Sequence, residues 1–232
     1  MTKSFRVGVL TLWMNSALED DLISLVRNDI GLHFHRFMPA KLPKDANDER
    51  YLHDLARNIH SQFKYFSKLG LDHIVIGCTS LATVMAQLPN TAEGVDITFA
   101  FDAILNQLKS ANCSQIGLVA PYSTSTIAEE KRLFNMEGVV VTDIARLNYE
   151  NEFKDTTTEE IVSKALCTYR QGGGIVISCT ALNTGDAINI LKLELPEAKL
   201  ITSSNHAIAA FINQLDDPIA LQQMTQGQQG DK

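Results

Sequence analysis

The chain has little of what marks several protein classes. Among its 232 residues are four cysteines, and no two of them have the C-x-x-C spacing of a zinc or redox site. They are too few and too far apart for a disulfide scaffold, so we expect free thiols in a reducing cytoplasm. No apolar run reaches the length of about 18 residues that a membrane span requires. The short apolar stretch near the N-terminus lacks the cleavage site of a signal peptide, and we interpret it as a first strand.

Basic residues are outnumbered by acidic ones. The chain has 20 Lys and Arg against 27 Asp and Glu, which gives a formal net charge of −7. Without a basic cluster, this balance argues against a nucleic acid or an anionic membrane as the main partner. The six histidines show no metal-ligand spacing, and the glycine run 172–174 precedes a strand, the reverse of a phosphate-binding loop. We therefore expect no metal and no organic cofactor.

Short apolar segments alternate with amphipathic ones along the whole chain. The apolar segments are rich in Val and Ile and lack polar alternation, which is typical of strands buried on both faces of a parallel sheet. They lie at 6–13, 73–80, 96–101, 115–121, 138–144, 173–180 and 198–204. The segments 49–70, 125–138 and 157–173 have helical spacing of apolar residues and end at glycine. This order predicts an α/β fold built on doubly wound parallel sheets.

The sequence also repeats itself once. A strand containing Gly8 recurs around Gly117, and the segment IVIGCTSLAT (74–83) recurs as IVISCTALNT (175–184) with seven of ten residues identical. We infer two homologous α/β lobes, residues 1–105 and 106–215, followed by a polar, Gln-rich tail over 216–232. The two lobes are expected to be pseudo-symmetric, with the active site in the cleft between them.

In each copy of the repeat, the apolar strand ends in a Cys-Thr pair, Cys78-Thr79 in the first and Cys179-Thr180 in the second. Ligands of open α/β sheets bind at the carboxyl ends of strands. A thiol at a helix N-terminus has a lowered pKa because unpaired N–H groups stabilise the thiolate, and we expect this of both cysteines. Two such thiols could act on opposite sides of one small carbon acid. One would remove a proton or add to the carbon, and the other would deliver a proton elsewhere. A free cysteine is more commonly a small buried apolar residue, and that is our interpretation of Cys113 and Cys167.

The two Cys-Thr segments resemble those of the aspartate/glutamate racemase superfamily, and the resemblance covers about residues 5–210. Within it the chain is most similar to the branch of maleate cis–trans isomerase and arylmalonate decarboxylase. The resemblance implies a cofactor-independent enzyme with Cys78 and Cys179 as its catalytic residues. The segment 8–19 keeps the Asn15 that holds a substrate carboxylate in that branch, but has Leu12 at its proline position.

The same resemblance implies further contacts with the carboxylates of a substrate. Tyr122 matches the tyrosine of the family's T-P-Y-T strand end, and Asn151 matches a second asparagine, with Asn148 as a competing choice. A turn-forming or capping role for Asn15 and an interlobe wall for Tyr122 are the structural alternatives. The full set of expected substrate-binding residues is Asn15, Thr79, Ser80, Tyr122, Asn151 and Thr180.

Departures from the family's patterns narrow the reaction. The amino-acid racemases of the superfamily have Glu after the second Cys-Thr pair, where this chain has Ala181. The decarboxylases have Gly at the first cysteine position, where this chain has Cys78. We therefore expect an isomerase of small (di)carboxylates that resembles maleate isomerase. An amino-acid or hydantoin racemase, a decarboxylase and a non-catalytic anion-binding protein remain alternatives. We also expect a homo-oligomer, a dimer or higher.

Overall fold

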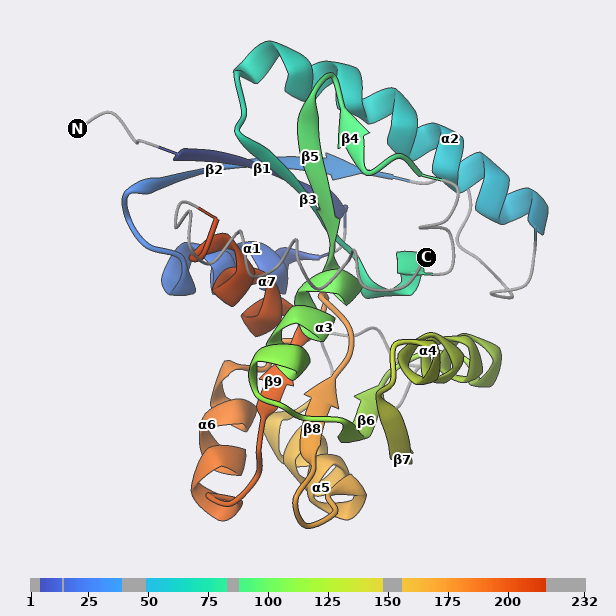
Figure 1. Ribbon diagram of the computed structural model, residues 1–232, viewed down its shortest axis with the longest axis vertical. Coiled ribbons are helices and arrows are strands. Elements are labelled where there is room, and N and C mark those ends of the chain that lie inside the picture. The colour runs from blue at the N-terminus through green and yellow to red at the C-terminus, as the bar shows by residue number, and fades with distance from the viewer. Residues whose placement is uncertain (1–4, 14, 39–48, 83–87, 148–155, 216–232) are drawn as a thin grey trace.

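The chain folds into two parallel β-sheets with helices packed on and between them (Figure 1). The computed structural model describes residues 5–13, 15–38, 49–82, 88–147 and 156–215. The strands are β1 (Phe5–Leu12), β2 (Ile30–Phe37), β3 (His73–Gly77), β4 (Thr91–Ala92), β5 (Val95–Phe99), β6 (Gln115–Ala120), β7 (Val140–Arg146), β8 (Gly174–Ile177) and β9 (Ile201–Ser203). The helices are α1 (Ser16–Leu25), α2 (Glu49–Phe66), η1 (Ser67–Leu69), α3 (Ala100–Ser110), α4 (Thr124–Met136), α5 (Thr158–Thr168), α6 (Gly185–Glu194) and α7 (Ser204–Ile212).

The two sheets have the same strand order, which confirms the predicted fold class. In the described residues, the first sheet has the order β2-β1-β3-β5-β4 and the second β7-β6-β8-β9. The strands β1, β3 and β5 therefore correspond to β6, β8 and β9, as the sequence repeat predicts. All pairings are parallel except that of β4, a short antiparallel addition to the first sheet that the sequence pattern did not indicate.

The strand β2 is absent from the predicted strands because its sequence mixes polar and apolar residues. His33 and His35 both lie within β2. His33 Nε2 accepts a hydrogen bond from Arg6 Nε at 3.2 Å, and His35 Nε2 lies 2.8 Å from Gln62 Oε1 of α2. These contacts give both histidines of β2, an edge strand of its sheet, a polar partner.

Apolar side chains of the strands pack against helices on both sheet faces, which explains the unbroken apolar runs. In the first sheet, Ile74 and Ile76 belong to a core that includes Ile59, Phe63 and Phe66 of the amphipathic helix α2. The alternate residues, among them Val75, belong to a second core that continues through α3 and α7 into the other sheet. The apolar interior is therefore shared between the two halves of the molecule.

Two helices join the halves. The helices α3 and α7 pack against each other, and α7 also packs on α1 (Figure 1). Phe101 of α3 lies against Phe134 of α4 with ring centroids 4.7 Å apart. The predicted lobe boundary at residue 105 lies inside α3, and the division into lobes stays a prediction.

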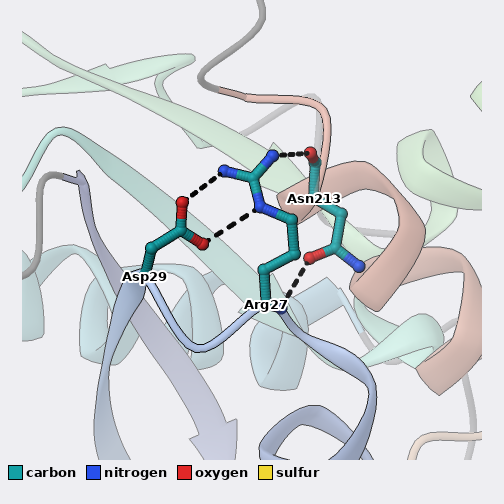
Figure 2. Close-up of polar contacts among 3 residues, drawn as sticks. All are labelled: Arg27, Asp29 and Asn213. Atoms are coloured by element: carbon teal, nitrogen blue, oxygen red, sulfur yellow. Dashed lines mark hydrogen bonds and ion pairs between the residues drawn. The ribbon is translucent and has the colours of Figure 1, made fainter.

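A polar contact adds to this packing at the end of α7 (Figure 2). The backbone N–H of Arg27, just after α1, donates to Asn213 Oδ1 at 2.9 Å, and Arg27 Nη1 donates to the Asn213 carbonyl at 3.3 Å. The same guanidinium pairs with Asp29 at 2.9 Å. Because Arg27 and Asp29 are largely exposed, this ion pair fixes geometry more than it adds stability.

The repeated glycines lie where a helix end crosses a strand. A Cβ at Gly8 would overlap Leu71 and Phe66, and a Cβ at Gly117 would lie 2.6 Å from the carbonyl oxygen of Thr168, the last residue of α5. The presence of a glycine on the first strand of each half therefore reflects close packing against that strand.

We predict that Gly117→Ala lowers the free energy of unfolding by about 1–3 kcal/mol, because backbone must move to admit the methyl group. Gly185→Ala is the matched control, since a Cβ there meets no atom within 4 Å. Urea denaturation of both variants measures the difference. Equal stability of the two variants would contradict this explanation of the glycine.

Candidate active site

Cys78 and Cys179 follow the last residues of two corresponding strands, β3 and β8. Both strands end earlier than expected, at Gly77 and Ile177, which leaves the cysteines in the turns beyond them. Both side chains are buried, with 4% and 5% of their surface exposed. A helical turn begins at Thr79, directly after Cys78. The expectation of a helix N-terminus at Cys179 is wrong, because α6 begins only at Gly185.

The expectation of lowered thiol pKa values is also wrong. Burial raises the pKa of Cys78, although the Ser80 hydroxyl at 3.2 Å and the backbone N–H groups of Ser80 and Leu81 oppose that shift. Burial raises the pKa of Cys179 to about 12 against the opposing N–H of Ala181 and hydroxyl of Tyr122. The energetic cost of removing a thiolate from water exceeds the stabilisation that the few hydrogen-bond donors facing it provide. Both thiols are therefore protonated at neutral pH.

The hydrogen bonds of the two thiols follow the repeat. In each half, the backbone N–H two residues after the cysteine points at the sulfur, from Ser80 in one and Ala181 in the other. A side-chain hydroxyl adds a further contact, from Ser80 to Cys78 and from Tyr122 to Cys179. A charge on Cys78 also raises the pKa values of Cys179 and Tyr122, so the three groups lie within electrostatic reach of one another.

Asn15 connects the two cysteine turns. Its Nδ2 donates to the Gly77 carbonyl at 3.3 Å and to Thr180 Oγ1 at 2.6 Å, and Thr180 Oγ1 itself donates to the Gly77 carbonyl at 3.1 Å. Asn15 precedes α1 but makes no side-chain capping bond, so the capping alternative for this residue is wrong. It lies between the two candidate catalytic residues and is 2% exposed.

Ser204 makes a second connection, which the sequence analysis missed. Its hydroxyl accepts a hydrogen bond from the backbone N–H of Cys179 at 3.1 Å and lies 2.8 Å from Thr79 Oγ1. Ser204 is the first residue of α7, directly after β9. The signal was present as the pair Ser203-Ser204 at the end of an apolar strand, a pattern typical of a helix start at the sheet edge where ligands bind.

Tyr122 follows β6 and is buried against Cys179. Burial raises its pKa well above the ordinary value, and negative charges on Cys179, Glu130 and Cys78 raise it further. Its phenol is therefore a neutral hydrogen-bond donor at physiological pH. The remaining expected residue, Asn151, and its competitor Asn148 lie outside the described residues.

A buried carboxyl lies behind Cys179 and was not expected from the sequence. Glu130 of α4 accepts a hydrogen bond from the hydroxyl of Ser178, the residue before Cys179. Burial raises the pKa of Glu130 to about 7, against the opposing hydrogen bond from Ser178. It is the only buried charged residue in the described part of the chain.

The site offers hydroxyl, amide and backbone N–H donors around two thiols, and no buried Lys or Arg among the described residues. Such neutral donors suit a carboxylate or a developing enediolate. No three His, Cys, Asp or Glu side chains gather as metal ligands in the ranges that the structure describes. Over the same ranges, no helix is both long and apolar enough to cross a membrane.

The other two cysteines lie away from this site. Cys113 is buried beside β6 and its thiol donates to the Gln115 carbonyl at 3.3 Å, in keeping with a structural role. Cys167 was expected to be a buried apolar residue, but it is exposed on α5.

Comparisons with known proteins support the fold. No protein-family model and no curated protein matches the sequence. Among solved structures, the maleate cis–trans isomerase of Nocardia farcinica bound to TRIS is 15% identical, with a TM-score of 0.75 over 93% of this chain and 94% of that one. The maleate isomerase Iso of Pseudomonas putida S16 is 16% identical, with a TM-score of 0.72 over 92% and 94%.

Arylmalonate decarboxylase is also similar, at 19% identity and a TM-score of 0.71 over 90% of this chain and 92% of that one. These matches confirm the predicted resemblance to this branch at the level of the fold. At such low identity, they leave the reaction to be argued from the residues of the chain itself.

We predict that iodoacetamide at pH 7 labels Cys167 first, and that Cys78 and Cys179 react at least about tenfold more slowly because only the thiolate attacks. Labelling of the two site cysteines should accelerate as the pH rises above 9. Peptide mass spectrometry at timed intervals measures each rate. Faster labelling of Cys78 than of Cys167 at pH 7 would contradict the raised pKa.

Proposed function

We propose that the protein is a cofactor-independent isomerase that converts a small cis-unsaturated dicarboxylate, such as maleate, into its trans isomer. The proposal rests chiefly on the two buried thiols at corresponding strand ends, within electrostatic reach of each other and joined through Asn15 and Ser204. Two thiols can act on adjacent carbons of one substrate, which a single thiol cannot.

Cys78 is the proposed nucleophile. Three hydrogen-bond donors face its sulfur, from Ser80 and Leu81, and they favour the thiolate once substrate binds. The Cys78 thiol gives its proton to solvent as the substrate binds and takes one back when the product leaves. In between, its thiolate adds to one carbon of the double bond, and the π electrons move towards the carboxylate on the other carbon to form an enediolate. A related maleate isomerase structure is described as holding a covalently bound succinylcysteine intermediate, which is the product expected of such an addition.

Cys179 is the proposed acid and base. Its thiol, protonated in the free protein, gives its proton to the carbon that carries the new electron pair. Rotation about the resulting single bond follows. The Cys179 thiolate then removes a proton from the same carbon, the double bond re-forms, and Cys78 leaves as thiolate. The atoms of the substrate are conserved, and no electron is gained or lost overall.

The neutral donors of the site would hold the two carboxylates. Thr79, Ser80 and Tyr122 are proposed for one, and Asn15, Asn151 and Thr180 for the other. The hydrogen bonds among Asn15, Thr180 and the Gly77 carbonyl preorganise these groups before substrate arrives, which keeps the energetic cost of reorganisation low.

We predict that the protein converts maleate to fumarate and that Cys78→Ala lowers the rate by at least about a thousandfold, because no other group can form the covalent bond. Proton NMR of the vinyl signals measures the conversion. Cys179→Ser is expected to accumulate an adduct on Cys78 with the mass of one substrate molecule, because the proton transfers are impaired. Cys167→Ser is the matched control and should leave turnover unchanged.

The alternative reactions give different outcomes in the same assays. Release of CO₂ from a substituted malonate would favour a decarboxylase, and solvent deuterium at the α-carbon of an amino acid or hydantoin would favour a racemase. Tight dicarboxylate binding without turnover would favour an anion-binding protein. Full turnover of maleate by both Cys78→Ala and Cys179→Ala would refute the paired-thiol mechanism.

A further inference from the structure

Glu130 is a carboxylic side chain that is almost completely buried, which is unusual for this residue type. It lies on the face of α4 that also buries Ile127 and Phe134, and it is 4% exposed. Its Oε1 accepts the hydrogen bond from Ser178, whereas its Oε2 is buried without a hydrogen-bond partner among the described residues. A buried carboxyl with an unpaired oxygen is destabilising, so packing alone gives no reason for this residue.

The other half of the molecule shows that the fold does not need a carboxyl at this point. Gly77 of β3 occupies the place of Ser178 in the repeat, directly before the cysteine. Leu18 of α1 packs there so closely that a Cβ at Gly77 would overlap its Cδ2. The residue before Cys78 is therefore packed against an apolar side chain of a helix, whereas the residue before Cys179 is hydrogen-bonded to a carboxyl group of a helix.

The carboxyl lies within electrostatic reach of the groups that would carry out the reaction. Negative charge on Glu130 raises the pKa values of both Cys179 and Tyr122. Other acidic groups on neighbouring elements are engaged elsewhere: Asp102 of α3 accepts from the Phe99 N–H, and Asp143 of β7 pairs with Arg170. No positively charged group is among the causes of the shift in the Glu130 pKa.

The turn that Glu130 supports is also strained. Cys179 has a φ of +149°, which L-residues rarely adopt. The hydrogen bond from Ser178 to Glu130 fixes the residue before it, and the hydrogen bond from the Cys179 N–H to Ser204 fixes the cysteine itself. The strained geometry is thus held from two sides, by α4 and by α7.

We propose that Glu130 is a positioning residue for Cys179: its carboxyl holds the turn through Ser178, and its protonation state controls how tightly the Cys179 thiol keeps its proton. This inference rests on the proposed function for its role in turnover, although the effect on the thiol is independent of it. Glu130 does not touch the substrate and transfers no proton to it.

The direction of the effect follows from the sign of the charges. Below a pH of about 7, Glu130 is neutral and places no penalty on a Cys179 thiolate. Above that pH it is negative and opposes the thiolate, which the proposed reaction forms when Cys179 protonates the intermediate. The carboxyl would therefore slow turnover as the pH rises through neutrality.

The test compares Glu130→Gln with the wild-type protein. Glutamine keeps an oxygen that accepts from Ser178 but never becomes negative. Iodoacetamide labelling of Cys179, followed by peptide mass spectrometry, should be equal in the two proteins at pH 6 and about tenfold faster in the variant at pH 9, which corresponds to a decrease of about one unit in the Cys179 pKa. The exposed Cys167 calibrates the reagent within each sample.

Glu129→Gln is the matched control. It removes the same charge one residue away, from a carboxylate that is ion-paired with Arg132 at 2.7 Å, and should leave the labelling of Cys179 unchanged. A second variant, Ser178→Ala, removes the hydrogen bond that opposes the upward shift of the Glu130 pKa. The pH at which the suppression of labelling begins should therefore move upwards.

Turnover gives an independent measurement. With an active substrate, the decline of kcat above pH 7 should disappear in Glu130→Gln while KM changes little. Equal Cys179 labelling in wild type and Glu130→Gln at every pH would overturn the inference, even if maleate is isomerised. A tenfold difference in labelling without turnover of any dicarboxylate would support the inference and refute the proposed function.

Discussion

The carbonyl of Gly77 accepts hydrogen bonds from Thr11, Asn15 and Thr180, and the placement of the two cysteine turns depends on this point. Thr180 comes from the second cysteine turn, so one backbone oxygen beside Cys78 is bonded to the residue that follows Cys179. Ser204 of α7 makes a second connection between the two turns, through Thr79 and the N–H of Cys179. Since all these groups are buried and share partners, water does not readily replace a bond that breaks, and the turns are held more firmly than single hydrogen bonds suggest.

The same burial decides the chemistry of the thiols. Near the surface, N–H groups at a turn would favour thiolates, but here desolvation outweighs them and keeps Cys78 and Cys179 protonated. In the resting site both thiols and Tyr122 are neutral, and no cation is buried among the described residues. The site therefore offers hydrogen bonds, and not charge, to an incoming carboxylate. Under the proposed mechanism, ionisation of Cys78 belongs to the bound state and not to the free protein.

The repeat made most of the fold predictable, because Gly8 with Gly117 and Cys78 with Cys179 occupy corresponding places in two sheets of one topology. β2 escaped prediction because its histidines and Arg36 interrupt the apolar pattern of an edge strand. Ser204 and Glu130 escaped because their roles depend on long-range contacts, with Cys179 and Ser178 respectively. The thiol pKa values were predicted in the wrong direction since a local turn pattern carries no information on the depth of burial.

Duplication gives two thiols in equivalent positions, but the proposed reaction requires them to behave differently. In the first half, Gly77 and Leu18 form an apolar support and the hydroxyl of Ser80 faces Cys78. In the second half, Ser178 and Glu130 introduce a carboxyl behind Cys179. An additional negative charge on that side opposes the Cys179 thiolate, which favours the neutral acid there and leaves nucleophilic attack to Cys78. The symmetric backbone thus places the two thiols in equivalent positions. The difference between Gly77 and Ser178, the residues before the two cysteines, is what makes Cys78 the nucleophile and Cys179 the acid in the proposed reaction.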